Sequence, residues 1–156
     1  MTAAIQILRQ MAAAEMKRKH TSYPENLTLP VKPYNDKTAN GLTRCIIDFL
    51  KFSGWQAERI NTTGRPVDRR EIVTNVIGQK RQIGSVEWIR SGSTPGSADI
   101  SATIRGRSVK IEVKIGSDRQ SEAQIRYQQA IEKAGGIYIV ARTFEQFYGW
   151  YQKTFN

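Results

Sequence analysis

The chain has 156 residues, enough for one folded domain with a core, and its 24 lysines and arginines against 14 acidic residues give a formal net charge of +10. That charge predicts a polyanionic partner, foremost nucleic acid, while one cysteine (Cys45) and one histidine (His20) exclude a zinc finger and an internal disulfide. Short apolar runs predict that the protein has no membrane partner, and the absence of a secretion signal predicts a cytoplasmic protein, which the expected nucleic-acid partner makes nucleoid-associated. No Walker-type glycine loop is present, so ATP is not implied.

The N-terminal part is predicted to hold a helix and an arm. Residues 2–19 show the three-and-four spacing of a helix with one apolar face, and its basic KRK end is either a solvated helix end or a DNA contact. Residues 21–37 contain three prolines among polar residues, which predicts an extended linker. We therefore expect residues 1–37 to form an N-terminal helix and proline-containing arm outside the main fold, which spans residues 38–156.

A second helix carries the strongest periodic signal. In residues 39–53 apolar side chains recur on one helix face, and Cys45 lies on that face as a small core residue. Residues 55–60 predict a strand, and the stretch NTTGRPVDRR after it predicts a basic, turn-rich loop. Residues 71–90 predict one or two further strands, and a flexible Gly/Ser loop then leads to Asp99.

The C-terminal half alternates strands with helices. Two alternating strands are expected at about 98–104 and 108–115. Ser121 and Gln124 form a capping-box signature that opens a helix, and a glycine pair ends it. The apolar strand IYIVA and an aromatic-rich final helix follow. This order predicts an α/β fold (α+β by strict order) with a mixed central sheet and flanking helices.

The hairpin of these two strands decides which side chains face each other. A two-residue turn at Arg105–Gly106 pairs Ile100 with Ile111 and places the apolar residues on one face. A shift of one residue would pair Ile100 with Glu112 and exchange the two faces. Burial therefore selects the first register, in which Asp99 lies opposite Glu112.

Three charges meet on the other face of this hairpin, because Lys114 lies one pleat beyond Asp99 and Glu112. Two close carboxylates repel each other, and one ammonium group neutralises only one of them, so a hard divalent cation fits between them. The plainer interpretation is a cross-strand charge cluster in solvent. The flexible loop before Asp99 and the capped helix with Gln124 favour the metal site.

Four motifs in chain order resemble those of the PD-(D/E)xK nuclease superfamily. They are GSADI, which contains Asp99, EVK, whose glutamate follows Asp99 by 13 residues, a glutamine in the next helix, and GGIYIVA. They look most like its VRR-NUC branch of virus-type replication-repair nucleases, which is similar to Holliday-junction resolvases. The resemblance covers about residues 39–150. It implies a restriction-endonuclease-like core of αβββαβα order and an Mg²⁺- or Mn²⁺-dependent endonuclease that hydrolyses phosphodiester bonds. It further implies duplex or branched DNA as partner, a homodimer, and a role in DNA replication, repair or recombination that would suit a phage or mobile element.

Site residues follow from that resemblance position by position. Asp99 and Glu112 would be metal ligands, together with the backbone carbonyl of Val113. Lys114 would orient or polarise the attacking water and stabilise charge on the phosphate. Gln124 matches the helix glutamine that supports the site.

The segment ERIN resembles the family's Arg–x–Asn segment, so Arg59 and Asn61 are expected to border the site. The chain also departs from the family, because Ala98 stands where proline is common and the segment TANGLT has no carboxylate, which leaves Asn40 as the nearest candidate there. This favours one metal ion over two.

The alternatives to a nuclease are a non-catalytic nucleic-acid-binding module on a nuclease-like fold and a basic assembly protein bound to RNA.

Basic side chains are the expected phosphate contacts, with an affinity that falls as salt rises. About half of the candidates are expected to be solvated charges without a DNA contact. The candidates are Arg65, Arg69, Arg70, Lys80, Arg81, Arg90, Arg119 and Arg126.

Overall fold

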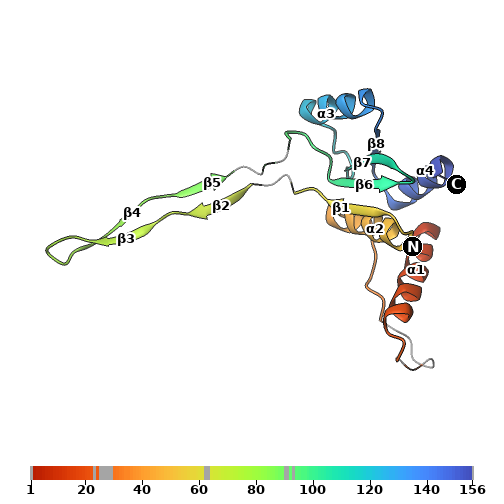
Figure 1. The fold of residues 1–156 in the computed structure, drawn as a ribbon, viewed down its shortest axis with the longest axis horizontal. Coiled ribbons are helices and arrows are strands. Elements are labelled where there is room, and N and C mark those ends of the chain that lie inside the picture. Colours follow the sequence, from red (N-terminus) through yellow and green to blue (C-terminus); the bar gives the residue numbers. More distant parts are fainter. Residues whose placement is uncertain are drawn as a thin grey trace. The chain divides into compact units, whose positions relative to one another are not determined.

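The computed structural model describes residues 2–22, 24, 30–61, 64–89, 92 and 94–155. The chain forms two compact units (Figure 1). One, which we call the core unit, is made of Met1–Ile60 and Pro95–Asn156, and the other, which we call the ribbon, is Asn61–Thr94. No helix in the described part of the chain is long and apolar enough to cross a membrane.

The core unit is built on a four-stranded mixed sheet. Its strand order is β1 (Gln56–Arg59), β6 (Ile100–Ile104), β7 (Arg107–Val113) and β8 (Ile137–Ala141). β1, β6 and β7 pair antiparallel, whereas β8 runs parallel to β7. A parallel pair needs a crossover, and helix α3 (Glu122–Lys133) supplies it. The α/β expectation of a mixed sheet with flanking helices is therefore confirmed.

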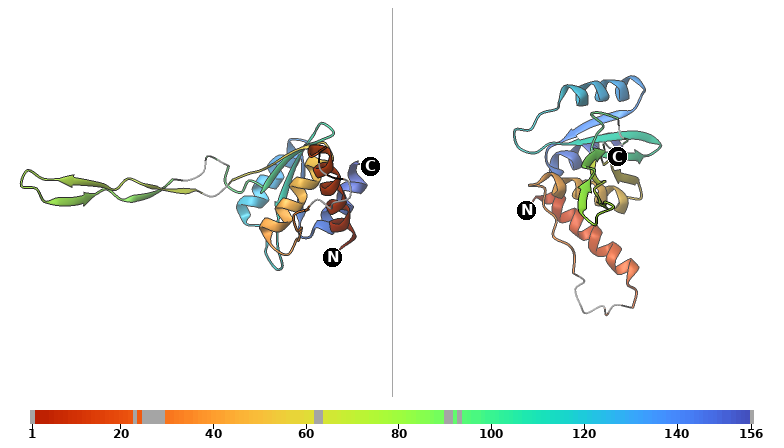
Figure 2. Two further views of the ribbon diagram at one scale, coloured as in Figure 1. Left: turned by 90° about the horizontal axis from the view of Figure 1, so that it is seen from below. Right: turned by 90° about the vertical axis from the view of Figure 1, so that its left-hand side faces the viewer.

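The helices cover the two faces of this sheet unequally. α1 (Ala3–Lys19), α2 (Ala39–Phe52) and α4 (Phe144–Phe155) share one apolar core with the sheet, while α3 lies over the opposite face (Figure 2). The aromatic ring of Phe49 forms the centre of that core and packs edge-on against several rings of α4. No residue of α3 is fully buried, and the face of the sheet beneath this helix carries polar side chains such as Glu112.

The predicted hairpin register is confirmed. Ile100 pairs with Ile111 and Ala102 with Val109, so the apolar side chains of β6 and β7 share the core face. Arg105 and Gly106 form the two-residue turn, with φ angles of 48° and 77°. Both residues therefore take the left-handed conformation of a type I′ hairpin turn, whose twist matches that of the strands.

The expected domain boundary is wrong at the N-terminus. Residues 1–37 were expected outside the main fold, but α1 contacts α2 and α4, and its side chains Ile5 and Leu8 are buried in the core. The apolar face of α1 is thus covered by its neighbours instead of by solvent. The segment that forms a separate unit is instead Asn61–Thr94.

The ribbon is an antiparallel double strand built from two short two-stranded sheets. β2 (Arg65–Asp68) pairs with β5 (Val86–Ile89), and β3 (Glu71–Thr74) pairs with β4 (Lys80–Ile83). The sequence predicted a loop where β2 lies, and one or two strands where the structure has three. The physical reason is that the pairing partner of β2 lies about twenty residues away, which local turn chemistry does not reveal.

Candidate metal and phosphate site

Glu112 is the buried centre of the polar face of the sheet. It lies on β7 with only 2% of its surface exposed. Its Oε1 accepts a hydrogen bond from Gln124 Nε2 and lies 3.2 Å from Lys114 Nζ. Its Oε2 lies 3.5 Å from the hydroxyl of Tyr138 on β8. Helix α3 and strands β7 and β8 thus hold the carboxylate from several directions.

Asp99 precedes β6 and is tied to both neighbouring strands. Its Oδ2 accepts a hydrogen bond from the Val113 backbone N–H at 2.9 Å, and its carbonyl oxygen accepts one from the Ile60 N–H at 2.8 Å. The backbone bond to Ile60 continues the pairing of β6 with β1 by one residue, and the side-chain bond from Val113 holds the Asp99 carboxylate against β7, near Glu112. Asp99 is only half-buried, so its carboxylate can be reached from solvent.

Lys114 follows β7 and is buried as well, with 7% of its surface exposed. Its Nζ lies 3.2 Å from Glu112 Oε1 and 3.4 Å from Asp118 Oδ2. The Lys114 N–H also donates to the Ala141 carbonyl at 3.0 Å, which fixes its backbone against β8. A cross-strand charge cluster in solvent would leave such side chains exposed, so the burial of Glu112 and Lys114 argues against that plainer interpretation.

Gln124 links the site to the start of α3. The predicted capping box is confirmed: the Gln124 N–H donates to Ser121 Oγ, and Gln124 Oε1 accepts from the Ser121 N–H at 2.9 Å. With its amide oxygen bound in this way, the Gln124 amide nitrogen is directed at Glu112. One side chain therefore caps the helix and orients the buried carboxylate.

The loop before Asp99 approaches α3 closely at Gly96. This residue has φ +80°, and a Cβ atom there would clash with the Ala123 carbonyl oxygen. Only glycine accommodates both the left-handed backbone and this contact. Gly96 therefore lets the Asp99 loop pack directly against the first turn of α3, next to Gln124.

The electrostatics of the site favour an added cation. Burial, followed by the negative charge of Asp99, raises the pKa of Glu112 to about 7, although Lys114 and Tyr138 act in the opposite direction. Burial also raises the pKa of the Tyr138 hydroxyl, and Glu112 adds to this shift. The buried lysine thus does not fully compensate the two carboxylates. A divalent cation would stabilise the charged form of both.

The donor set fits one hard cation held in part by water. Within residues 2–22, 24, 30–61, 64–89, 92 and 94–155 there is no group of three His, Cys, Asp or Glu side chains placed to hold a metal ion. Asp99 and Glu112 can supply carboxylate oxygens. The backbone carbonyl oxygen of Val113 could add a third ligand, since the neighbouring Val113 N–H already holds Asp99 in place. Mg²⁺ commonly binds through one or two carboxylates and keeps several waters.

The three expected border residues have different positions. Arg59 ends β1 and pairs with Ile100, which places its side chain on the face of the sheet opposite to Asp99. Asn40 is exposed in the first turn of α2, and in the described part of the chain no hydrogen bond or ion pair joins it to Asp99 or Glu112. Asn61 begins the ribbon. The structure therefore does not bring Arg59 or Asn40 into contact with the carboxylates.

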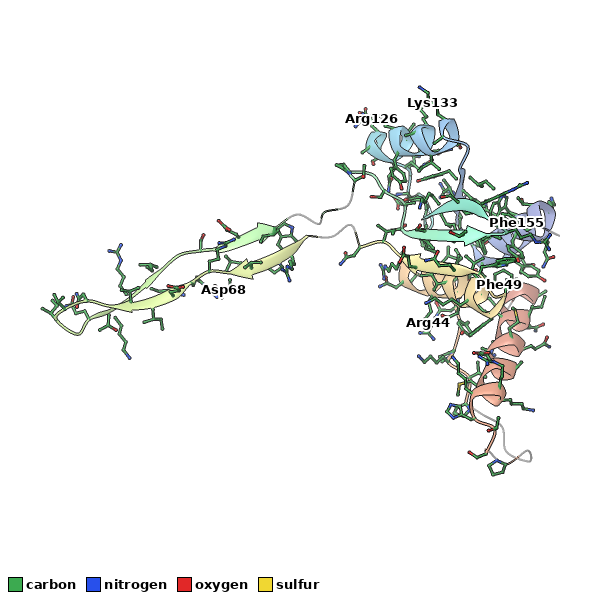
Figure 3. The ribbon with its side chains drawn as sticks, viewed as in Figure 1. Arg44, Phe49, Asp68, Arg126, Lys133 and Phe155 are labelled. Atoms are coloured by element: carbon green, nitrogen blue, oxygen red, sulfur yellow. The ribbon has the colours of Figure 1, made fainter. Side chains whose placement is uncertain are left out.

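Most of the candidate phosphate contacts fall on the ribbon, where Arg69 is paired with Glu87 and Arg70 with Asp68. Arg119 is exposed just after Asp118, and Arg126 lies on the outer surface of α3, where it pairs with Glu122 (Figure 3). Arg90 lies outside the described residues. The ribbon members are Arg65, Arg69, Arg70, Lys80 and Arg81.

Sequence reasoning missed two members of the site. Tyr138 reaches Glu112 from β8, and Asp118 reaches Lys114 from the loop after β7. The spacing of four residues between Lys114 and Asp118 was a usable signal. No sequence signal pointed to Tyr138, because its place depends on the parallel register of β7 and β8, in which Glu112 pairs with Val140.

No protein-family model and no curated protein matches the chain.

Proposed function

We propose that the chain is a metal-dependent DNA endonuclease with Asp99, Glu112 and Lys114 at its centre. The observation that carries the proposal is the burial of Glu112 beside a second carboxylate and a buried lysine, with its pKa raised to about 7. Burying charged groups next to each other costs folding stability, and groups with strongly shifted pKa values cluster at functional sites. Its residue types and spacing resemble the PD-(D/E)xK nucleases of the VRR-NUC branch.

The element order of the core unit supports a restriction-endonuclease-like fold. From α2 onward the core unit runs α2, β1, β6, β7, α3, β8 and α4, with three antiparallel strands and a fourth parallel to the third. This is compatible with the αβββαβα order implied by the resemblance. Asp99 and Glu112 then lie at the end of neighbouring central strands, where side chains of both strands converge.

Asp99, Glu112 and the Val113 carbonyl would hold Mg²⁺ or Mn²⁺, which when bound polarises a phosphate oxygen and lowers the pKa of a bound water. Lys114 Nζ carries the positive charge closest to Glu112 and stabilises negative charge that develops on the phosphate during in-line attack. Gln124 holds the Glu112 carboxylate in one orientation. Tyr138 closes the other side of that carboxylate.

The net charge of +10 supplies affinity for the phosphate backbone, and this affinity falls as salt rises. Duplex or branched DNA is the proposed substrate, in replication, repair or recombination. A single small domain cuts both strands only as a homodimer or in two visits, and the resemblance to resolvases favours the homodimer.

The experiment is a cleavage assay on linear, nicked, flapped and four-way DNA with Mg²⁺ or Mn²⁺. We expect the wild type to cut at least one of these, and Glu112→Gln and Asp99→Asn to lose at least about a hundredfold in rate. Lys110→Met is the matched control, because Lys110 lies on the same face of β7 and, within the described residues, its ammonium group bonds to Ser101 at 2.6 Å and to no carboxylate. Cleavage by Glu112→Gln at the wild-type rate would show that the site is assigned wrongly.

One observation favours a second candidate, a non-catalytic DNA-binding module on the same fold. No third acidic side chain joins Asp99 and Glu112 in the described part of the chain, and the first turn of α2 carries Asn40 where a carboxylate would complete a larger metal site. DNA binding without cleavage under all metal conditions would select this candidate.

A further inference from the structure

Exposed apolar side chains are concentrated on the ribbon. Among the described residues, eight of the nine large apolar side chains with high exposure lie between Asn61 and Thr94, and the ninth is Ile125 on α3. In the four ribbon strands only Val67 is even partly shielded. An isolated two-stranded hairpin is marginally stable in water, and a concentration of exposed apolar groups marks an interaction site.

The tip of the ribbon is held in one shape by its own hydrogen bonds. Asn75 Oδ1 accepts from the N–H groups of Ile77 and Gln79 at 3.2 and 2.8 Å, and the Asn75 N–H donates to the Gln79 carbonyl at 2.9 Å. This closed turn presents Val76 and Ile77, whose exposed fractions are 106% and 73%. The two apolar side chains at the tip are therefore pre-organised for contact.

The ribbon is also basic, with six lysines and arginines against three acidic residues between Asn61 and Thr94. The acids pair mainly with Arg69 and Arg70 near its middle. Lys80 and Arg81, directly after the tip, have no salt bridge within the described residues. The apolar side chains at the tip and the positive charges directly after it match a partner that is negatively charged and also has apolar surfaces. A second copy of this chain would instead bring like charges together.

We propose that the ribbon is a DNA-docking arm that enters a groove of duplex DNA. Val76 and Ile77 insert against a base step as an apolar wedge, and Lys80 and Arg81 bind the adjacent phosphates. Two-stranded ribbons are known to enter DNA grooves, and apolar wedges bend the duplex by about 20–90°. The stacked bases supply the apolar surface that a soluble anion lacks. The choice of DNA as partner rests on the proposed function.

The test uses the full chain in EDTA, so that binding is measured without hydrolysis. A 30-base-pair duplex with a dye at each end reports affinity by anisotropy and bending by energy transfer. We expect Val76→Ser/Ile77→Ser to lose the bending signal and about tenfold in affinity. Lys80→Ala/Arg81→Ala should lose about tenfold in affinity and lower the salt slope by about 2, as expected for two lost phosphate contacts.

Matched controls come from the core unit. Ile125→Ser removes an exposed apolar side chain, and Lys133→Ala/Lys153→Ala removes two exposed positive charges. Both should bind and bend DNA as the wild type does. Thermal unfolding checks that all variants are folded, which we expect because every substituted side chain is exposed. If the ribbon variants bind and bend DNA like these controls, the docking arm is disproved.

The outcomes separate the arm from the nuclease. Loss of binding in the ribbon variants without any DNA cleavage by the wild type would leave the arm standing and remove the nuclease proposal. Cleavage by the wild type, with unaltered binding and bending in the ribbon variants, would remove the arm alone. If Val76→Ser/Ile77→Ser converts a dimer into a monomer in sedimentation without changing DNA affinity, the tip is a self-association surface and the proposal is overturned.

Discussion

Gln124 and Glu112 are joined by a hydrogen bond from helix α3 to strand β7, in which Gln124 Nε2 donates to Glu112 Oε1. The same glutamine accepts from the Ser121 N–H through its other amide atom. The first turn of α3 and the buried carboxylate therefore depend on one side chain. The hydrogen bond thus ties α3, a helix with no fully buried residue, to the sheet beneath it.

Gln124→Ala is expected to reduce both stability and cleavage. It leaves Glu112 Oε1 without its amide donor and removes half of the capping box, at a cost of about 1–3 kcal/mol in the free energy of unfolding. Cleavage should fall at least about tenfold, because Glu112 is no longer held in one orientation. Urea unfolding and the cleavage assay measure the two effects. Gln129→Ala, on the exposed side of the same helix, is the control and should change neither.

The stability of the metal-free protein should decrease as pH rises through the titration of Glu112. The folded-state pKa of about 7 lies above the ordinary value of 4.5, so the folded state binds the proton more tightly than the unfolded state. The stabilisation is complete below about pH 4.5 and is lost as pH rises to about 7, by on the order of 3 kcal/mol.

Unfolding of wild type and Glu112→Gln in EDTA from pH 4.5 to 8 isolates this contribution. The free-energy difference between the two proteins should shift in favour of the variant as pH rises. A constant difference over that range would show that the pKa of Glu112 is not raised.

Lys114→Met should separate chemistry from DNA binding. Without the ammonium group, Glu112 and Asp118 lose their shared partner, and the positive charge next to the reacting phosphate disappears. We expect at least a hundredfold loss in cleavage rate and less than a twofold change in DNA affinity. Above pH 7 the free energy of unfolding should fall by about 3 kcal/mol.

The control for this variant is Lys110→Met, which removes the same charge from the same strand face together with the hydrogen bond to Ser101. It should cut DNA at nearly the wild-type rate. Equal cleavage losses in the two variants would show that Lys114 contributes only general positive charge.

Gly96→Ala should loosen the site from the loop side. The new Cβ would meet the Ala123 carbonyl in a left-handed backbone, so the loop has to move away from α3. We expect a loss of more than about 1 kcal/mol in the free energy of unfolding, together with reduced cleavage. Gly92→Ala is the matched control, because a Cβ atom there meets nothing within 4 Å. Equal stability of the two variants would contradict the tight contact.

Local sequence patterns were enough to predict the register of the β6–β7 hairpin and the start of helix α3. The turn at Arg105–Gly106 and the alternation of apolar residues define one register, because a shift of one residue would expose the core face. That register puts Asp99 next to Glu112. The Ser121–Gln124 capping box is similarly local, since its bonds span three residues. The fold class followed from the order of these elements.

Only the tertiary structure decided which elements share a core and which side chains complete the site. The burial of Ile5 and Leu8 depends on the docking of α1 against α2 and α4, which no local pattern specifies. Tyr138 reaches Glu112 through the parallel pairing of β7 and β8, which a helical crossover separates in sequence. Local chemistry thus determined the carboxylate pair, whereas long-range packing determined its burial and its raised pKa.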